Sequence, residues 1–148
     1  MSEATKKVAK KSSFTYAVGR RKTANARVRI YATPSVPGKD GVQMTINGKK
    51  AEEYFPGETA KAAYRKPFII TETLSKMSAS VVVAGSGKMG QLDATVHGIA
   101  RALALLDRDA FRGLLKSAGL LTRDARTRQR RMVGTGGKAR RAKQSPKR

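Results

Sequence analysis

Cysteine is missing from this chain, and histidine occurs once, as His97, among 148 residues. The lack of cysteine excludes disulfides and thiolate metal sites, and it leaves the redox compartment open. A single histidine could form a metal centre or a catalytic dyad only with carboxylates as partners, and no such cluster stands out in the sequence. We therefore expect no metal site and no cofactor.

Acidic residues are also scarce, with 10 Asp and Glu against 32 Lys and Arg and a net charge of +22. The excess lies at the ends: +8 over residues 1–31, +4 over residues 32–122 and +10 over residues 123–148. Folding does not require strongly cationic ends, and their self-repulsion costs free energy. Such ends therefore indicate a polyanionic partner. Nucleic acid is the first candidate for that partner.

Long apolar runs do not occur either. No stretch approaches the roughly 18 apolar residues of a membrane span, and the basic first segment lacks the apolar core of a secretory signal. An acidic membrane surface is the second candidate partner, but no Trp, Phe, Tyr or Leu follows Leu121 among the C-terminal charges. We expect no membrane partner, a cytoplasmic protein, and a short flexible basic arm over residues 1–12.

The segment over residues 123–148, called the arm below, holds eleven Lys and Arg against one acid, Asp124. It has too few apolar side chains to offset an ordering entropy of about 1–2 kcal/mol per residue, and its glycines and Pro146 disfavour a long helix. We predict an extended arm whose cations lie along phosphates, with a solubilising tail as the alternative. The candidate RNA contacts are Arg123, Arg126, Arg128, Arg130, Arg131, Lys138, Arg140, Arg141 and Lys143.

Two strands are expected near the start of the chain. Residues 14–18 place apolar side chains at one parity, and residues 24–30 alternate apolar with polar ones, which predicts a half-buried strand with a cationic outer surface. Residues 19–23, called the basic turn below, lie between the two strands. There a glycine precedes three cations, which can face phosphates together. A solubilising turn is the alternative. The candidate contacts here are Arg20, Arg21, Lys22 and Arg27.

Turn residues and apolar spacing predict the remaining elements of a globular domain over residues 13–122. They are a loop at residues 33–41, a strand at 42–46, an Asn47-Gly48 turn, a helical stretch at 51–55, a helix at 58–65 ended by Pro67, a buried central strand at 78–84, an amphipathic helix at 92–106 and a second helix at 109–118 closed by Gly119. Residues 68–71 fit a strand or a helix. In the second helix, Phe111, Leu114 and Leu115 are expected to face the core.

A glycine-rich loop at residues 85–90 matches G-x-G-x-x-G between a strand and a helix. A dinucleotide-binding unit would continue with a parallel strand and a ribose-binding acid, but here a second helix and a polycation follow. Lys88 also lacks the spacing and the following Ser or Thr of a P-loop. We therefore predict no catalytic residues and no small-molecule substrate. The loop either binds an RNA phosphate through its amides or allows close packing.

RNA suits this chain better than DNA. The sequence contains no helix-turn-helix, zinc finger or basic zipper, because its two strong helices are needed for the core. Basic segments that become ordered on binding fit an irregular folded RNA better than a regular groove. We interpret His97 as a partly buried structural residue or one that touches RNA.

Several collinear segments together resemble a known family, that of protein nine of the bacterial small ribosomal subunit. They are GRRKTANARVRI at 19–30, INGKKAEEYFP at 46–56, GSGKMGQ at 85–91, HGIARAL at 97–103, LLKSAGLLTRDAR at 114–126, and KARR with a terminal KR. Each segment alone is weak evidence. In this order they are specific, and they span most of the chain.

The resemblance implies an α+β fold, a two-layer α/β sandwich like the second domain of ribosomal protein five, with an extended basic C-terminal tail. It implies a structural ribosomal constituent that binds small-subunit rRNA in the head, beside neighbouring head proteins, with its tail directed to peptidyl-site tRNA. By matching position, the basic turn would contact rRNA, and Lys138, Arg140 and Arg141 would line the path of the tail. Lys147 and Arg148 would approach tRNA phosphate.

One departure from the family concerns the tip of the arm. Ser145 and Pro146 stand where the family usually has an aromatic residue followed by Ser or Thr. The resemblance therefore implies the cationic contact of the last residues with tRNA but not an aromatic one. The alternative function is a free-standing nucleoid or RNA-chaperone protein that binds any nucleic acid.

Overall fold

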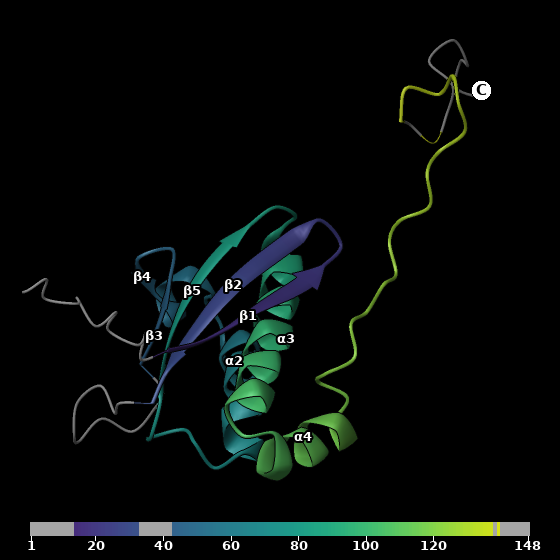
Figure 1. The fold of residues 1–148 in the computed structure, drawn as a ribbon. Coiled ribbons are helices and arrows are strands. Elements are labelled where there is room, and N and C mark those ends of the chain that lie inside the picture. Colours follow the sequence, from purple (N-terminus) through teal and green to yellow (C-terminus); the bar gives the residue numbers. More distant parts are fainter. Residues whose placement is uncertain (1–13, 33–42, 138, 140–148) are drawn as a thin grey trace, which may run out of the picture.

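The structure, a computed structural model, describes residues 14–32, 43–137 and 139 and has the expected α+β fold (Figure 1). The predicted N-terminal arm, the loop at residues 33–41 and six candidate contacts lie outside the described residues. Those six are Lys138, Arg140, Arg141, Lys143, Lys147 and Arg148. The elements are β1 (Phe14–Arg21), β2 (Ala24–Tyr31), β3 (Gln43–Ile46), β4 (Lys49–Lys50), α1 (Ala51–Tyr54), α2 (Glu58–Ile70), β5 (Ser78–Ala84), α3 (Lys88–Leu106) and α4 (Arg108–Ser117).

The strands form one sheet in the order β1-β2-β5-β3-β4. β1 and β2 make an antiparallel hairpin that turns at Lys22 and Thr23, so the predicted break over residues 19–23 was too long and residues 19–21 belong to β1. β5 runs antiparallel to β2, and β3 runs parallel to β5. The predicted central position of residues 78–84 is thus confirmed. It follows that the basic turn lies at one end of the sheet.

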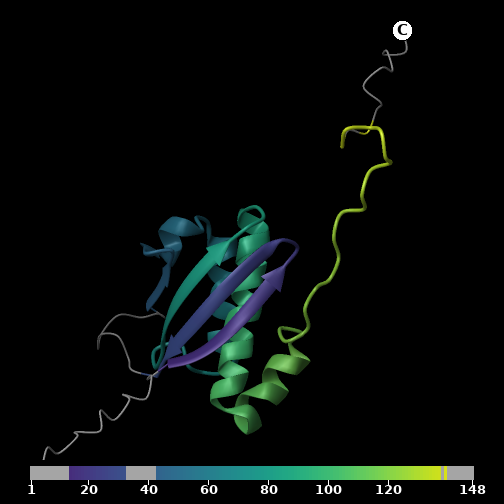
Figure 2. The same cartoon turned by 45° about the horizontal axis from the view of Figure 1, so that its top comes forward.

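Helices cover one face of this sheet, which gives two layers (Figure 2). β2 buries Ala26, Val28 and Ile30 on the covered face, as its alternating pattern predicted. β5 is buried on that face only: Val82 is 57% exposed between two buried valines. The strand predicted to be buried is therefore buried on one face only, because no described element covers the other.

α3 packs so closely against β1 and β2 that two glycines are needed where they meet. A Cβ atom added to Gly19 would lie 1.9 Å from the Ala94 carbonyl oxygen, and one added to Gly98 would lie 2.6 Å from a methyl carbon of Val28. The covered face of β1 therefore carries Ala17 and Gly19, while its larger apolar residues lie on the open face, where Tyr16 is 46% exposed.

α2 continues through Pro67 to Ile70, so the predicted end near residue 65 was wrong and residues 68–71 are helical up to Ile70. Tyr64 and Phe68 are one turn apart and both buried, with Phe68 fully so. Burying such a side chain contributes about 1.5–3 kcal/mol, which offsets much of the cost of a proline in the helix.

Asp107 caps the start of α4: its carboxylate accepts a hydrogen bond from the Ala110 N–H at 3.1 Å. The helix ends where Gly119 takes a φ of +73°, and the N–H groups of Gly119 and Leu120 bond back to Lys116 and Leu115. Leu115 is buried, but Leu114 is 49% exposed, so the inward position predicted for Leu114 was wrong.

Candidate nucleic-acid interface

The described part of the arm leaves the domain as an irregular chain (Figures 1 and 2). Residues 123–132 contain no helix or strand, as predicted. Most side chains of this stretch are exposed. The exposed ones include all five of its arginines: Arg123, Arg126, Arg128, Arg130 and Arg131. These guanidiniums are thus accessible to a partner. The boundaries at residues 12 and 122 stay predictions.

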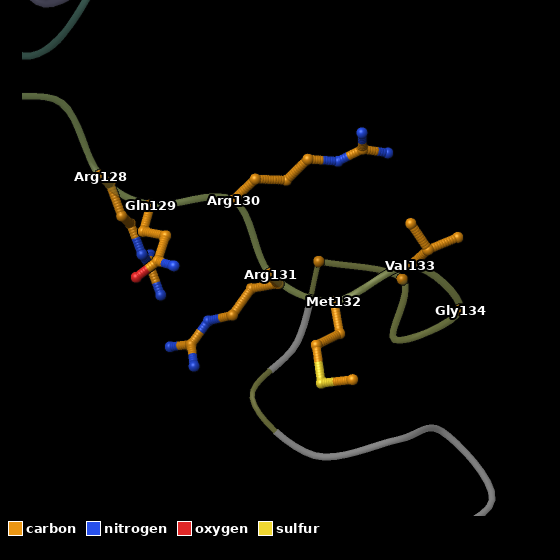
Figure 3. Close-up of a pocket in the computed structure, with 9 residues that line it drawn as sticks. Arg128, Gln129, Arg130, Arg131, Met132, Val133 and Gly134 are labelled. Carbon is orange, nitrogen blue, oxygen red and sulfur yellow. The ribbon is translucent and has the colours of Figure 1, made fainter.

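The arm turns sharply at residues 133–137. Its three glycines take positive φ values, which residues with a side chain rarely adopt: +84° at Gly134, +58° at Gly136 and +75° at Gly137. Both the N–H and the hydroxyl of Thr135 donate hydrogen bonds to the Met132 carbonyl. Figure 3 shows Arg130 pointing away from the side on which Arg128 and Arg131 lie. The cations can therefore reach phosphates on more than one side of the arm.

Arg21 fastens the arm to the end of β1. Its side chain is 14% exposed, and its guanidinium donates to the Arg126 carbonyl at 2.8 Å and more weakly to the Asp124 carbonyl at 3.4 Å. The same guanidinium lies 3.0 Å from a carboxylate oxygen of Asp124 and 3.5 Å from one of Asp93. The three cations of the basic turn thus differ in their surroundings. Arg21 faces internal partners, while Arg20 and Lys22 are exposed.

Asp124 is the centre of this attachment. Besides Arg21, it accepts hydrogen bonds from Arg126, from the side chain at 2.7–3.1 Å and from the backbone N–H at 2.9 Å. These bonds hold the pKa of the Asp124 carboxyl far below its usual range. The sole acid of the arm is therefore ionised at neutral pH and neutralises cations of its own chain. Sequence reasoning missed this role, although one acid in a cationic segment was a signal.

His97 joins the same two regions from α3. Its Nδ1 accepts a hydrogen bond from the Arg20 N–H at 3.3 Å, and it also hydrogen bonds to the Leu121 backbone. Burial lowers the pKa of His97 against the opposing effect of the Leu121 bond, and the cations of Arg101 and Arg123 lower it further. His97 is thus partly buried and holds the basic turn in place, as the structural interpretation expects, and a contact with RNA stays a prediction.

A shallow hollow lies where the basic turn, α2, α3 and the start of the arm meet. Its lining includes Arg20, Lys66, Asp93, His97, Leu120 and Thr122. Arg20 and Lys66 are both exposed cations here. The fold therefore places the basic turn beside the origin of the arm, although about a hundred residues separate them in sequence.

Packing explains part of the glycine-rich loop. A Cβ atom at Gly85 would lie 2.3 Å from the Thr23 carbonyl, and one at Gly90 would lie 2.6 Å from the Ser86 hydroxyl. Gly87 precedes α3 in open space, and Lys88 places its ammonium 3.5 Å from the centre of the Tyr54 ring. Close packing thus accounts for two of the glycines, and a phosphate contact at this loop stays a prediction.

Arg27 lies on the face of the sheet that the helices leave open. It and Arg29 are exposed on β2, with Val18 and Val82 as the neighbours of Arg27 in register. This placement agrees with the cationic outer surface expected for residues 24–30. Arg27 is therefore separate in space from the helices, and it adds a second cationic area to that of the arm.

Comparison with known proteins places these features in a family. The profile described as Ribosomal protein S9/S16 matches residues 19–148, which include the basic turn, both long helices and the whole arm. The chain belongs to this family. The resemblance found in the sequence is thereby confirmed.

Three relatives of this S9/S16 family member carry the name small ribosomal subunit protein uS9. The protein of Desulfovibrio desulfuricans is 47% identical over 121 residues, which cover 82% of this chain and 87% of the relative. The proteins of Maridesulfovibrio salexigens and Solidesulfovibrio magneticus are 44% and 43% identical over 124 residues, each covering 84% of this chain and 89% of the relative.

Within residues 14–32, 43–137 and 139, no group of three metal-ligating side chains comes together. Over the same ranges, no helix has both the length and the apolar character needed to cross a membrane.

Proposed function

We propose that this S9/S16 family member is a structural constituent of the small ribosomal subunit that binds rRNA in the head and extends its arm to peptidyl-site tRNA. The family match over residues 19–148 and the names of the relatives support the ribosomal role. In this role it is not an enzyme. It lies beside neighbouring head proteins and belongs to cytoplasmic ribosomes. Charge and exposure support the contacts with rRNA and tRNA.

The observation that carries the RNA contact is the row of exposed arginines on an arm fixed at its origin. Guanidiniums form two parallel hydrogen bonds with phosphate, and each phosphate neutralised releases counterions. The exposed cations of the basic turn, Arg20 and Lys22, would bind rRNA beside the origin of the arm. Lys138, Arg140, Arg141 and Lys143 would continue the path, and Lys147 with Arg148 would contact tRNA.

The test compares the full chain with a variant that lacks residues 127–148 and keeps the Arg21 attachment. Both proteins are reconstituted into small subunits depleted of the native protein, and peptidyl-site tRNA binding is measured. We expect the shortened protein to enter the subunit and to weaken tRNA binding. The double variant Lys147→Ala/Arg148→Ala should show part of that loss, whereas Lys49→Ala/Lys50→Ala, a matched removal of charge from β4, should not.

Two results would contradict this proposal. Unchanged tRNA affinity after removal of residues 127–148 would show that the arm does not reach tRNA. Loss of the full chain from small subunits in a high-salt wash would favour a free-standing nucleic-acid-binding protein, because binding through phosphates alone falls steeply with salt.

A further inference from the structure

The side of the sheet away from the helices is a second candidate contact surface. We call it the open face; it consists of Phe14, Tyr16, Val18, Arg27, Arg29, Tyr31, Ser80 and Val82. In register, Tyr16 lies beside Arg29, and Arg27 lies between Val18 and Val82. The helices lie on the opposite side (Figure 2), so none of the described elements covers it.

The charge of the open face is of one sign. Arg27 and Arg29 are exposed and, two residues apart on β2, point the same way. None of the five described strands contains Asp or Glu, and no ion pair of Arg27 or Arg29 occurs among the described residues. Within the described part of the chain the two guanidiniums therefore have no acidic partner, unlike Arg21, and an anionic ligand would supply one.

Aromatic rings lie among these cations. The rings of Phe14 and Tyr31 are 5.9 Å apart, and the Arg29 guanidinium lies 5.3 Å from the centre of the Phe14 ring. Tyr16, in the next row, is 46% exposed. Sheets that combine exposed rings with cations bind unpaired RNA, because bases stack on the rings while phosphates meet the charges.

We propose that the open face binds an unpaired stretch of RNA, with Arg27 and Arg29 on its phosphates and Tyr16 stacked on a base. A protein partner would fit less well, because the exposed apolar area is limited to Tyr16 and Val82, interrupted by two arginines. This inference rests on the proposed function, since both need RNA. It adds a second contact surface, on the side of the sheet away from α3.

The test uses the full chain and a single-stranded twelve-nucleotide uridine oligomer that carries 4-thiouridine, with fluorescence anisotropy measured over a range of salt. Arg27→Ala/Arg29→Ala should lower affinity about tenfold and reduce the salt slope by about 1.4, the value for two single-strand phosphate contacts. The matched control, Arg108→Ala/Arg112→Ala, removes two exposed arginines from α4 and should leave the slope unchanged. Circular dichroism verifies the fold of each variant.

Photo-crosslinking of the same complexes, mapped by mass spectrometry, identifies the surface directly. Crosslinks to Tyr16 are expected in the unmodified chain, and Tyr16→Leu should remove them and lower affinity about fivefold. Crosslinks confined to the arm and the basic turn, or equal losses in the two double variants, would overturn the open-face proposal and leave the role of the arm intact. Failure of the unmodified chain to bind RNA would instead sink the proposed function.

The same variants also distinguish binding of RNA by the open face from binding of a protein. If Arg27→Ala/Arg29→Ala binds the oligomer like the unmodified chain yet fails to stay in reconstituted small subunits, the open face contacts a protein. That result would overturn the RNA assignment.

Discussion

Gly19 lies where β1 and α3 meet without space for a methyl group. Gly19→Ala would drive a Cβ atom against the backbone of Ala94 and Gly98, so we expect a loss of about 3 kcal/mol in the free energy of unfolding. Gly113 is the matched control, because nothing lies within 4 Å of a Cβ atom there. Gly113→Ala, inside α4, should stabilise by about 0.5–1 kcal/mol. Urea unfolding measures both, and equal effects would contradict the close contact.

The histidine makes stability depend on pH. Because burial lowers the pKa of His97 in the folded protein, its contribution is fully present above the unfolded pKa of about 6.5 and is lost as pH falls through that value towards the folded pKa. Melting temperature should thus fall between about pH 7 and pH 5 more steeply for the unmodified chain than for His97→Gln. Parallel pH curves for the two proteins would argue against this.

At the level of single residues, the sequence predicted the charges but not their partners. Arg21 looked like Arg20 and Lys22, one of three equal cations. Only folding brings it to Asp124, 103 positions later, and to Asp93 on α3. Contacts of this separation depend on how the helices pack, and a pattern within one segment carries no information about them.

Among the elements, the start of the arm offers the clearest test. Asp124→Asn removes the charge that holds Arg21 and Arg126, so trypsin should cleave after Arg123 or Arg126 several times faster. Glu72→Gln, the same change at an exposed position at the end of α2, should not alter cleavage.

The same attachment has a defined pH range. Because the pKa of Asp124 is lowered in the folded chain, the attachment should persist at neutral pH and weaken only as pH falls below the usual aspartate range of about 4. Chemical shifts of residues near Asp124, followed by NMR, would show this, and a transition near pH 6 would contradict it.

Elements with a regular apolar period were predictable, and those decided by tertiary packing were not. β2 and α3 followed their patterns because one face of each meets the core. α2 did not stop at Pro67, because burial of Tyr64 and Phe68 on the same face outweighs the local cost. In β1 the larger apolar residues lie on the open face, because α3 leaves space only for Ala17 and Gly19.

For the molecule as a whole, two truncations separate the arm from its attachment. Removing residues 127–148 should change the free energy of unfolding by less than about 0.5 kcal/mol, because within the described part of the chain residues 127–137 make no hydrogen bond or ion pair with the domain. Removing residues 123–148 should lower it further, since Asp93 is then the only acidic partner of Arg21 among the described residues. Thermal unfolding of both variants measures this, and an unfolded shorter variant would place the domain boundary beyond residue 122.

The uneven charge of the chain predicted a polyanionic partner and an arm without regular structure, and the family match supports that interpretation. What it could not predict is that the basic turn and the origin of the arm meet. Net charge describes how much a molecule attracts RNA, whereas the position of each cation is set by the fold.

The Arg21 attachment has a consequence for how strongly each part must bind. In the proposed complex, with the basic turn bound to RNA, the arm would search only the volume around its fixed origin, which corresponds to a local concentration in the millimolar range. Each distal contact then needs little intrinsic affinity and can be made and broken quickly. The same arm supplied as a separate peptide would have to be added at millimolar concentration to replace the one that is attached.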